Sequence, residues 1–108
     1  MTKVELITAI GNTLTQLDNA LGDPALVNQP AKWQQAFAMR NHLDQQQREL
    51  LVATIQSDDE AFQTLTGKIQ AATKQLQQTI DDLKKIDSII NTIGEISADL
   101  DQILKAAA

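Results

Sequence analysis

The chain has 108 residues, the usual size of a single domain, and a net charge of −5. An acidic protein lacks the basic face needed for non-specific binding to nucleic acid or to anionic membranes. The sequence contains no cysteine, which excludes disulfides, thiol catalysis and cysteine-ligated zinc.

Apolar residues make up 43% of the sequence, but aromatic residues make up only 3%, so we expect a mostly aliphatic core. Glycine and proline are scarce, good helix formers are abundant, and no alternating run bounded by turns suggests a strand. We therefore predict one all-α domain spanning residues 1–108. The N-terminal segment lacks the apolar stretch of a signal peptide, so we expect a cytoplasmic location.

The first helix is predicted at residues 3–21. Thr2 and Glu5 have the spacing of a capping box, in which each side chain accepts from the backbone N–H of the other residue. Gly22 is expected to end the helix in the left-handed conformation, and Pro24 prevents its continuation. Apolar residues at steps of three and four form one face, namely Ile7, Ile10, Leu14, Leu17 and Leu21.

A second helix is predicted at residues 30–56, after a connection that contains one turn capped by Asp23. Pro30 suits the first helical position, where its missing N–H would be unpaired anyway. The middle of this helix is polar and interrupts the apolar stripe at Gln47. We expect Trp33 and Phe37 to close one end of the core. The residues predicted to face the core are Trp33, Ala36, Phe37, Leu43, Leu50, Leu51 and Ile55.

A third helix is predicted at residues 57–106. Ser57 and Glu60 repeat the capping-box spacing, and acids at 58–60 suit the positive end of a helix dipole. A heptad register then continues to the end of the chain, which indicates a coiled-coil-like seam. Its first core positions are Phe62, Ile69, Leu76, Leu83, Ile90, Ser97 and Leu104, and its second are Leu65, Ala72, Thr79, Ile86, Ile93 and Leu100.

The apolar face of this helix widens toward its C-terminus. The position before each first core residue is polar in the first half (Lys68, Gln75, Asp82) and isoleucine in the second. Such a wide face needs cover from more than one helix. We therefore predict that it binds a partner or forms an oligomer face; its residues are Leu83, Ile86, Ile89, Ile90, Ile93, Ile96, Leu100 and Ile103.

The architecture we expect is an antiparallel hairpin or bundle of three helices, in which the helix over 57–106 is continuous. That helix would be about 75 Å long, and a thin rod with half-exposed apolar stripes would tend to self-associate. The alternative is a break near Lys84–Asp87, which would close a four-helix bundle. Neither glycine nor proline marks such a break, and the register crosses it without a slip.

The residues that could carry chemistry do not form a catalytic pattern. His42 is the only histidine, and Asp44 lies two residues away on a different face of the helix. Adjacent acids at 58–60 point in different directions on a helix, and the acids from Asp81 to Asp101 fall largely outside the heptad core. Lysines in the first half of the third helix and acids in its second half would meet in an antiparallel pairing. We predict no enzymatic activity, no metal and no cofactor.

The sequence therefore favours a non-enzymatic interaction or structural protein that forms a homo-oligomer or docks on partner helices. One alternative is a regulatory, adaptor or immunity-type protein whose acidic face binds a basic partner. Another is a membrane-active, toxin-like component that inserts its isoleucine-rich segment, although interfacial helices usually carry basic rather than acidic polar faces. Neither nucleic acid nor a membrane is the expected partner.

Overall fold

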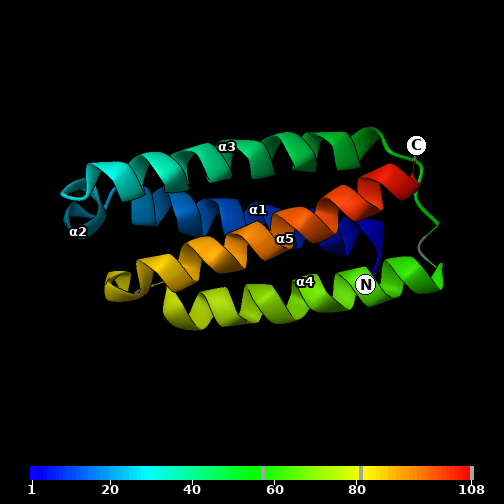
Figure 1. The fold of residues 1–108 in the computed structure, drawn as a ribbon. Coiled ribbons are helices and arrows are strands. Elements are labelled where there is room, and N and C mark those ends of the chain that lie inside the picture. Colours follow the sequence, from blue (N-terminus) through cyan, green and yellow to red (C-terminus); the bar gives the residue numbers. More distant parts are fainter. Residues whose placement is uncertain (57, 81, 108) are drawn as a thin grey trace.

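The structure is a computed structural model that describes residues 1–56, 58–80 and 82–107. These residues form helices joined by short connections, with no strand among them (Figure 1). The all-α prediction is thus confirmed. The molecule measures 43 × 22 × 18 Å, which is far shorter than the rod of about 75 Å that a continuous third helix would give.

Helix α1 spans Lys3–Leu21, as predicted. Its capping box is also present: the Glu5 N–H donates to Thr2 Oγ1 at 3.2 Å, and the Thr2 N–H donates to Glu5 Oε1 at 3.1 Å. The predicted face points into the core, with Ile10, Leu14 and Leu17 buried.

The connection after α1 holds the expected single turn, α2 (Pro24–Val27), in which Asp23 Oδ1 accepts from the Ala25 N–H at 2.9 Å. The left-handed conformation predicted for Gly22 is wrong, because its φ is −86°. A left-handed residue is not needed here, since the Asp23 N–H bonds to the Ala20 carbonyl and the chain turns directly into α2.

Helix α3 spans Pro30–Val52 and therefore ends four residues before the predicted position 56. The backbone becomes extended at Ala53, where φ is −74° and ψ is 140°. Lys3 Nζ donates to the carbonyl oxygens of Leu51 at 3.3 Å and Ala53 at 2.7 Å, so a side chain from α1 satisfies the end of the helix.

The core-facing stripe of α3 differs from the prediction at both ends and in the middle. Leu43 and Leu50 are buried, but Phe37 and Leu51, both expected in the core, are 43% and 60% exposed. The polar middle does not interrupt the packing, because Gln46 occupies a buried position between the two leucines.

The continuous third helix is wrong, and the alternative break is the one observed. Helix α4 spans Glu60–Thr79, a 3-10 turn η1 covers Leu83–Lys85, and α5 spans Ile86–Ala106. The chain thus folds back a few residues earlier than the sequence alternative placed the break. Folding back lets the wide apolar face of α5 pack against α3 and α4 of the same chain.

The start of α4 also differs from the prediction. The helix begins at Glu60, and its cap is Asp59, whose Oδ1 accepts from the Ala61 N–H at 2.8 Å. The predicted cap at Ser57 lies outside the described residues.

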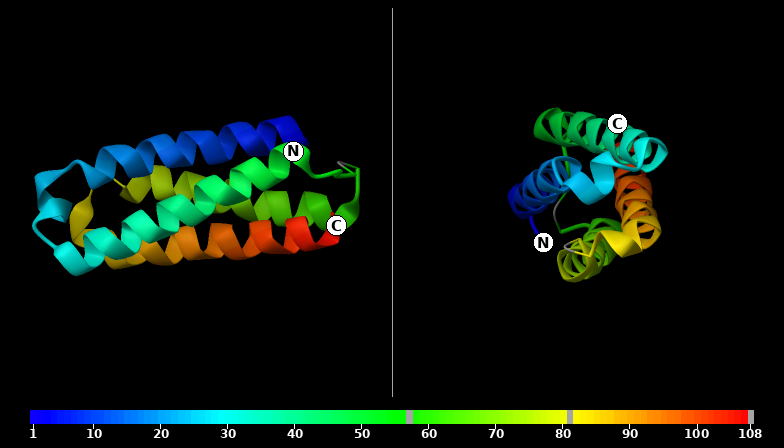
Figure 2. Two further views of the ribbon diagram at one scale, coloured as in Figure 1. Left: turned by 90° about the horizontal axis from the view of Figure 1, so that it is seen from above. Right: turned by 90° about the vertical axis from the view of Figure 1, so that its left-hand side faces the viewer.

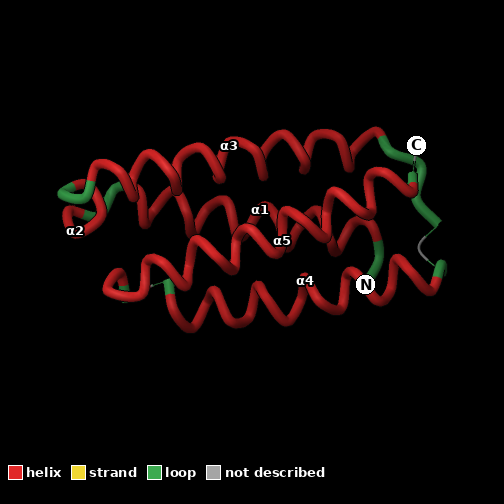
Figure 3. Tube along the Cα trace, in the orientation of Figure 1, coloured by secondary structure: helices red, strands yellow, loops and turns green. Residues whose placement is uncertain are grey.

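The four long helices run alternately up and down as a bundle (Figures 1 and 3). Helix α3 packs on α1 and α5, α4 packs mainly on α5, and α4 meets α1 less extensively. Figure 2 shows this arrangement along and across the bundle. No helix in the described part of the chain is both long enough and apolar enough to span a membrane.

Candidate interaction surface

The residues predicted to bind a partner lie inside the chain. Ile89, Ile96 and Ile103 are 1%, 0% and 3% exposed, and the other described members of the predicted face are also buried. The side chain of Leu83 lies outside the described part of the structure. The face is as wide as expected, but helices of the same chain cover it.

Three of the exposed large apolar side chains lie near the end of the bundle where α1 begins and α3 ends, while Val27 and Phe37 are exposed elsewhere. Val4, Leu51 and Val52 are 72%, 60% and 86% exposed. The Lys3 bond to the Leu51 carbonyl holds the two helix ends beside each other. Sequence reasoning missed this cluster, because it placed Leu51 in the core.

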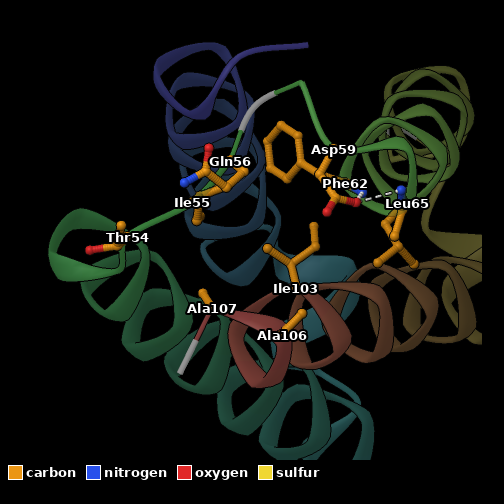
Figure 4. A pocket seen from close by; sticks show the side chains of 10 residues that line it. Thr54, Ile55, Gln56, Asp59, Phe62, Leu65, Ile103, Ala106 and Ala107 are labelled. Atoms are coloured by element: carbon orange, nitrogen blue, oxygen red, sulfur yellow. Dashed lines mark hydrogen bonds between the residues drawn. The ribbon is translucent and has the colours of Figure 1, made fainter.

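The same end contains a small apolar cavity of about 140 Å³ between the 54–56 segment, the start of α4 and the end of α5 (Figure 4). Among the described lining residues, the carboxylate of Asp59 is engaged in capping α4. A cavity of this size can hold one small apolar group. Its lining residues are Thr54, Ile55, Gln56, Asp59, Ala61, Phe62, Leu65, Ile103, Ala106 and Ala107.

A second, more open hollow of about 460 Å³ runs between α4 and α5. Lys68 on α4 and the acids Glu95 and Asp99 on α5 line it, together with small side chains such as Ala71 and Ala98. The basic first half and the acidic second half of the predicted third helix therefore lie side by side within one chain.

His42 is exposed on α3. Asp44, its nearest acid in sequence, pairs with Arg48 at 3.0 Å and with Arg40 at 3.6 Å. Arg40 also binds Asp18 through Nε at 2.8 Å, and this contact raises the pKa of the guanidinium. The carboxylates of Asp18 and Asp44 thus form ion pairs with arginines and do not orient the imidazole of His42.

The described acids among those considered as metal ligands have structural roles or face outward, and Asp81 lies outside the described residues. Asp59 caps α4, and Asp87 pairs with Lys32 across the bundle surface. Among the described residues, no group of three or more histidine, cysteine, aspartate or glutamate side chains could hold a metal ion.

A buried polar contact that sequence reasoning missed joins α3 to α5. Gln46 is 1% exposed, and its Nε2 donates to the Ser97 carbonyl at 2.9 Å and to Asp101 Oδ1 at 2.8 Å. The sequence signal for this contact is the position of Gln46 between Leu43 and Leu50, because the helical period places all three side chains on one face of α3.

In comparisons with known proteins, neither a family model, nor a curated protein, nor a solved structure matches this chain.

Proposed function

We propose that this protein is a non-enzymatic interaction protein, a helical bundle that associates with a second copy of itself through coiled-coil-like contacts. The observation that carries the proposal is the heptad register of the sequence, whose seven-residue spacing continues from α4 into α5 without a slip. Phe62, Ile69 and Leu76 on α4 and Ile90 on α5 occupy the first core position and are buried, whereas Ser97 and Leu104, at the same position on α5, are half-buried. Two separate antiparallel helices can place their core residues independently of each other. A long helix in a coiled coil must instead keep one heptad register along its whole length.

The surface chemistry is compatible with this role. The proposal includes a cytoplasmic location, which suits a chain without cysteine. The exposed cluster of Val4, Leu51 and Val52 adds apolar area that association can cover.

Sedimentation velocity across a wide range of protein concentrations tests the proposal. We expect a reversible or slowly exchanging dimer whose fraction rises with concentration. A monomer at every concentration, up to the highest that remains soluble, would contradict self-association.

A second candidate function is an adaptor or immunity-type role with a basic partner, which the net charge of −5 favours. Attraction between exposed charges of opposite sign falls as salt rises, because the screening length shortens to about 10 Å at 0.1 M. Binding to a basic test protein that disappears at moderate salt would support this role, and salt-independent binding would oppose it.

A further inference from the structure

The connection between α4 and α5 contains no residue that forces a helix to stop. Helix α4 ends at Thr79, and η1 begins at Leu83. The sequence over residues 80–85, IDDLKK, includes neither glycine nor proline. Helix propensity alone therefore permits one helix through the turn.

The apolar register crosses this turn without a slip. Leu76, Leu83 and Ile90 are spaced by whole heptads, and so are Thr79 and Ile86. A turn in a hairpin does not require this spacing, because each helix can set its own phase. A continuous helix does require it.

The surface that fits α5 is also known in detail. It is the surface of α3 and α4, where Gln46 bonds to Ser97 and Asp101 and where the isoleucines of α5 are buried. A second copy of this chain presents the same surface, with every partner of α5 in place. Exchange of a helix between identical chains needs no new complementary interface.

We propose that two copies of this chain exchange α5. In the exchanged dimer, α4 and α5 join into one helix from Glu60 to Ala106, about 70 Å long, and each α5 packs on α3 and α4 of the other copy. This inference rests on the proposed self-association and specifies its geometry. The contacts of α5 are the same in both forms, so the turn and the protein concentration set the balance between them.

Asp82 is the residue at the turn whose contact favours the closed form. Its Oδ1 accepts from the Lys84 N–H at 3.2 Å, as the cap of η1. In a continuous helix this bond is lost, while Asp82 and Lys85 become a favourable pair three residues apart.

A matched pair of variants, Asp82→Ala and Asp82→Gly, tests the role of the turn. Both lose the cap, but alanine favours a continuous helix over glycine by roughly fivefold per helix, and thus roughly twenty-five-fold per dimer. We expect sedimentation equilibrium to show tighter dimerisation of Asp82→Ala by about this factor. Equal dissociation constants for the two variants would overturn the exchange.

The decisive measurement is a distance within one chain. The protein has no cysteine, so spin labels can be placed at Gln70→Cys and Gln102→Cys, both exposed, and the labelled chain diluted into excess unlabelled protein. The closed hairpin places the labels roughly 20 Å apart, and the exchanged dimer places them roughly 48 Å apart.

The outcomes distinguish failure of the α5 exchange from failure of the proposed self-association. A long distance in the dimer fraction, with a short one in the monomer, supports the exchange. A dimer that keeps the short distance overturns the exchange but leaves self-association in place. A chain that is monomeric throughout overturns both.

Discussion

Gln46 on α3 and Ser97 on α5 hold each other through two hydrogen bonds in the core of the bundle. Gln46 Nε2 donates to the Ser97 carbonyl at 2.9 Å, and Ser97 Oγ donates to Gln46 Oε1 at 3.0 Å. No buried side-chain nitrogen or oxygen among the described residues lacks a partner. A satisfied polar pair inside an apolar seam fixes the register of the two helices, because a shifted register would leave both groups unpaired.

Replacement of Gln46 should therefore destabilise the fold. We expect Gln46→Ala to lower the free energy of unfolding by about 3 kcal/mol, through lost volume and lost bonds, and Gln46→Met by about 1 kcal/mol. Urea denaturation measures both. Equal losses would mean that packing volume at this position matters little.

Substitution of Ile96 tests whether this residue acts in the core of one chain or at a surface that faces a partner. It is 0% exposed within one chain, so Ile96→Ala should cost about 3 kcal/mol of unfolding free energy. Val4 is 72% exposed, and Val4→Ala should change stability by less than about 0.5 kcal/mol. The idea of a core role fails if Ile96→Ala weakens dimerisation but leaves the unfolding of the monomer unchanged.

Trp33 ties the start of α3 to the end of α1. Its Nε1 donates to the Leu21 carbonyl at 2.9 Å, and its ring stacks on Phe37 with centroids 5.0 Å apart. We expect Trp33→Ala to cost about 2 kcal/mol and Phe37→Ala less than about 1 kcal/mol, because Phe37 is 43% exposed whereas Trp33 is half-buried and hydrogen-bonded. Thermal denaturation measures both, and an unchanged melting temperature in Trp33→Ala would contradict the role of this ring in closing the core.

Asp59 should matter more than its neighbour Asp58, because only Asp59 is observed to cap α4. Asp59→Ala should cost about 1 kcal/mol, Asp59→Asn should retain most of the stability, and Asp58→Ala should have little effect. Denaturant midpoints of the three variants provide the comparison. An equal loss from Asp58→Ala would point to general charge effects at the helix start.

Glu5 makes stability depend on pH in the acid range. The hydrogen bond from the Thr2 backbone, followed by that from its side chain, lowers the pKa of Glu5 below its ordinary value of 4.5. The pKa of Glu5 is lower in the folded than in the unfolded protein. Its contribution to the free energy of unfolding is therefore fully present above the unfolded pKa and is lost as pH falls through the folded pKa.

The matched variant is Glu5→Gln, which retains the capping box without a titratable group. Its urea midpoint should fall less than that of the unchanged protein as pH is lowered below 4.5. Parallel pH profiles for the two proteins would show that Glu5 does not contribute.

Local sequence signals were sufficient for α1, where the cap at Thr2, the apolar period and Pro24 act within a few residues of one another. They were also sufficient for the wide apolar face at Ile89, Ile96 and Ile103, because helical periodicity fixes which side chains share a face. The sequence by itself thus determined an all-α chain and the side chains that must be covered.

Only the tertiary structure decided what covers them. Whether the chain continues or turns at residues 80–85 depends on burial against α3 and α4, which are distant in sequence, and no local breaker marks the place. The exposure of Phe37 and Leu51 and the burial of Gln46 have the same origin, since each depends on a neighbouring helix. The free energy of packing between helices exceeds the small differences in local helix propensity. Packing therefore decided the position of the turn, which no local sequence signal marks.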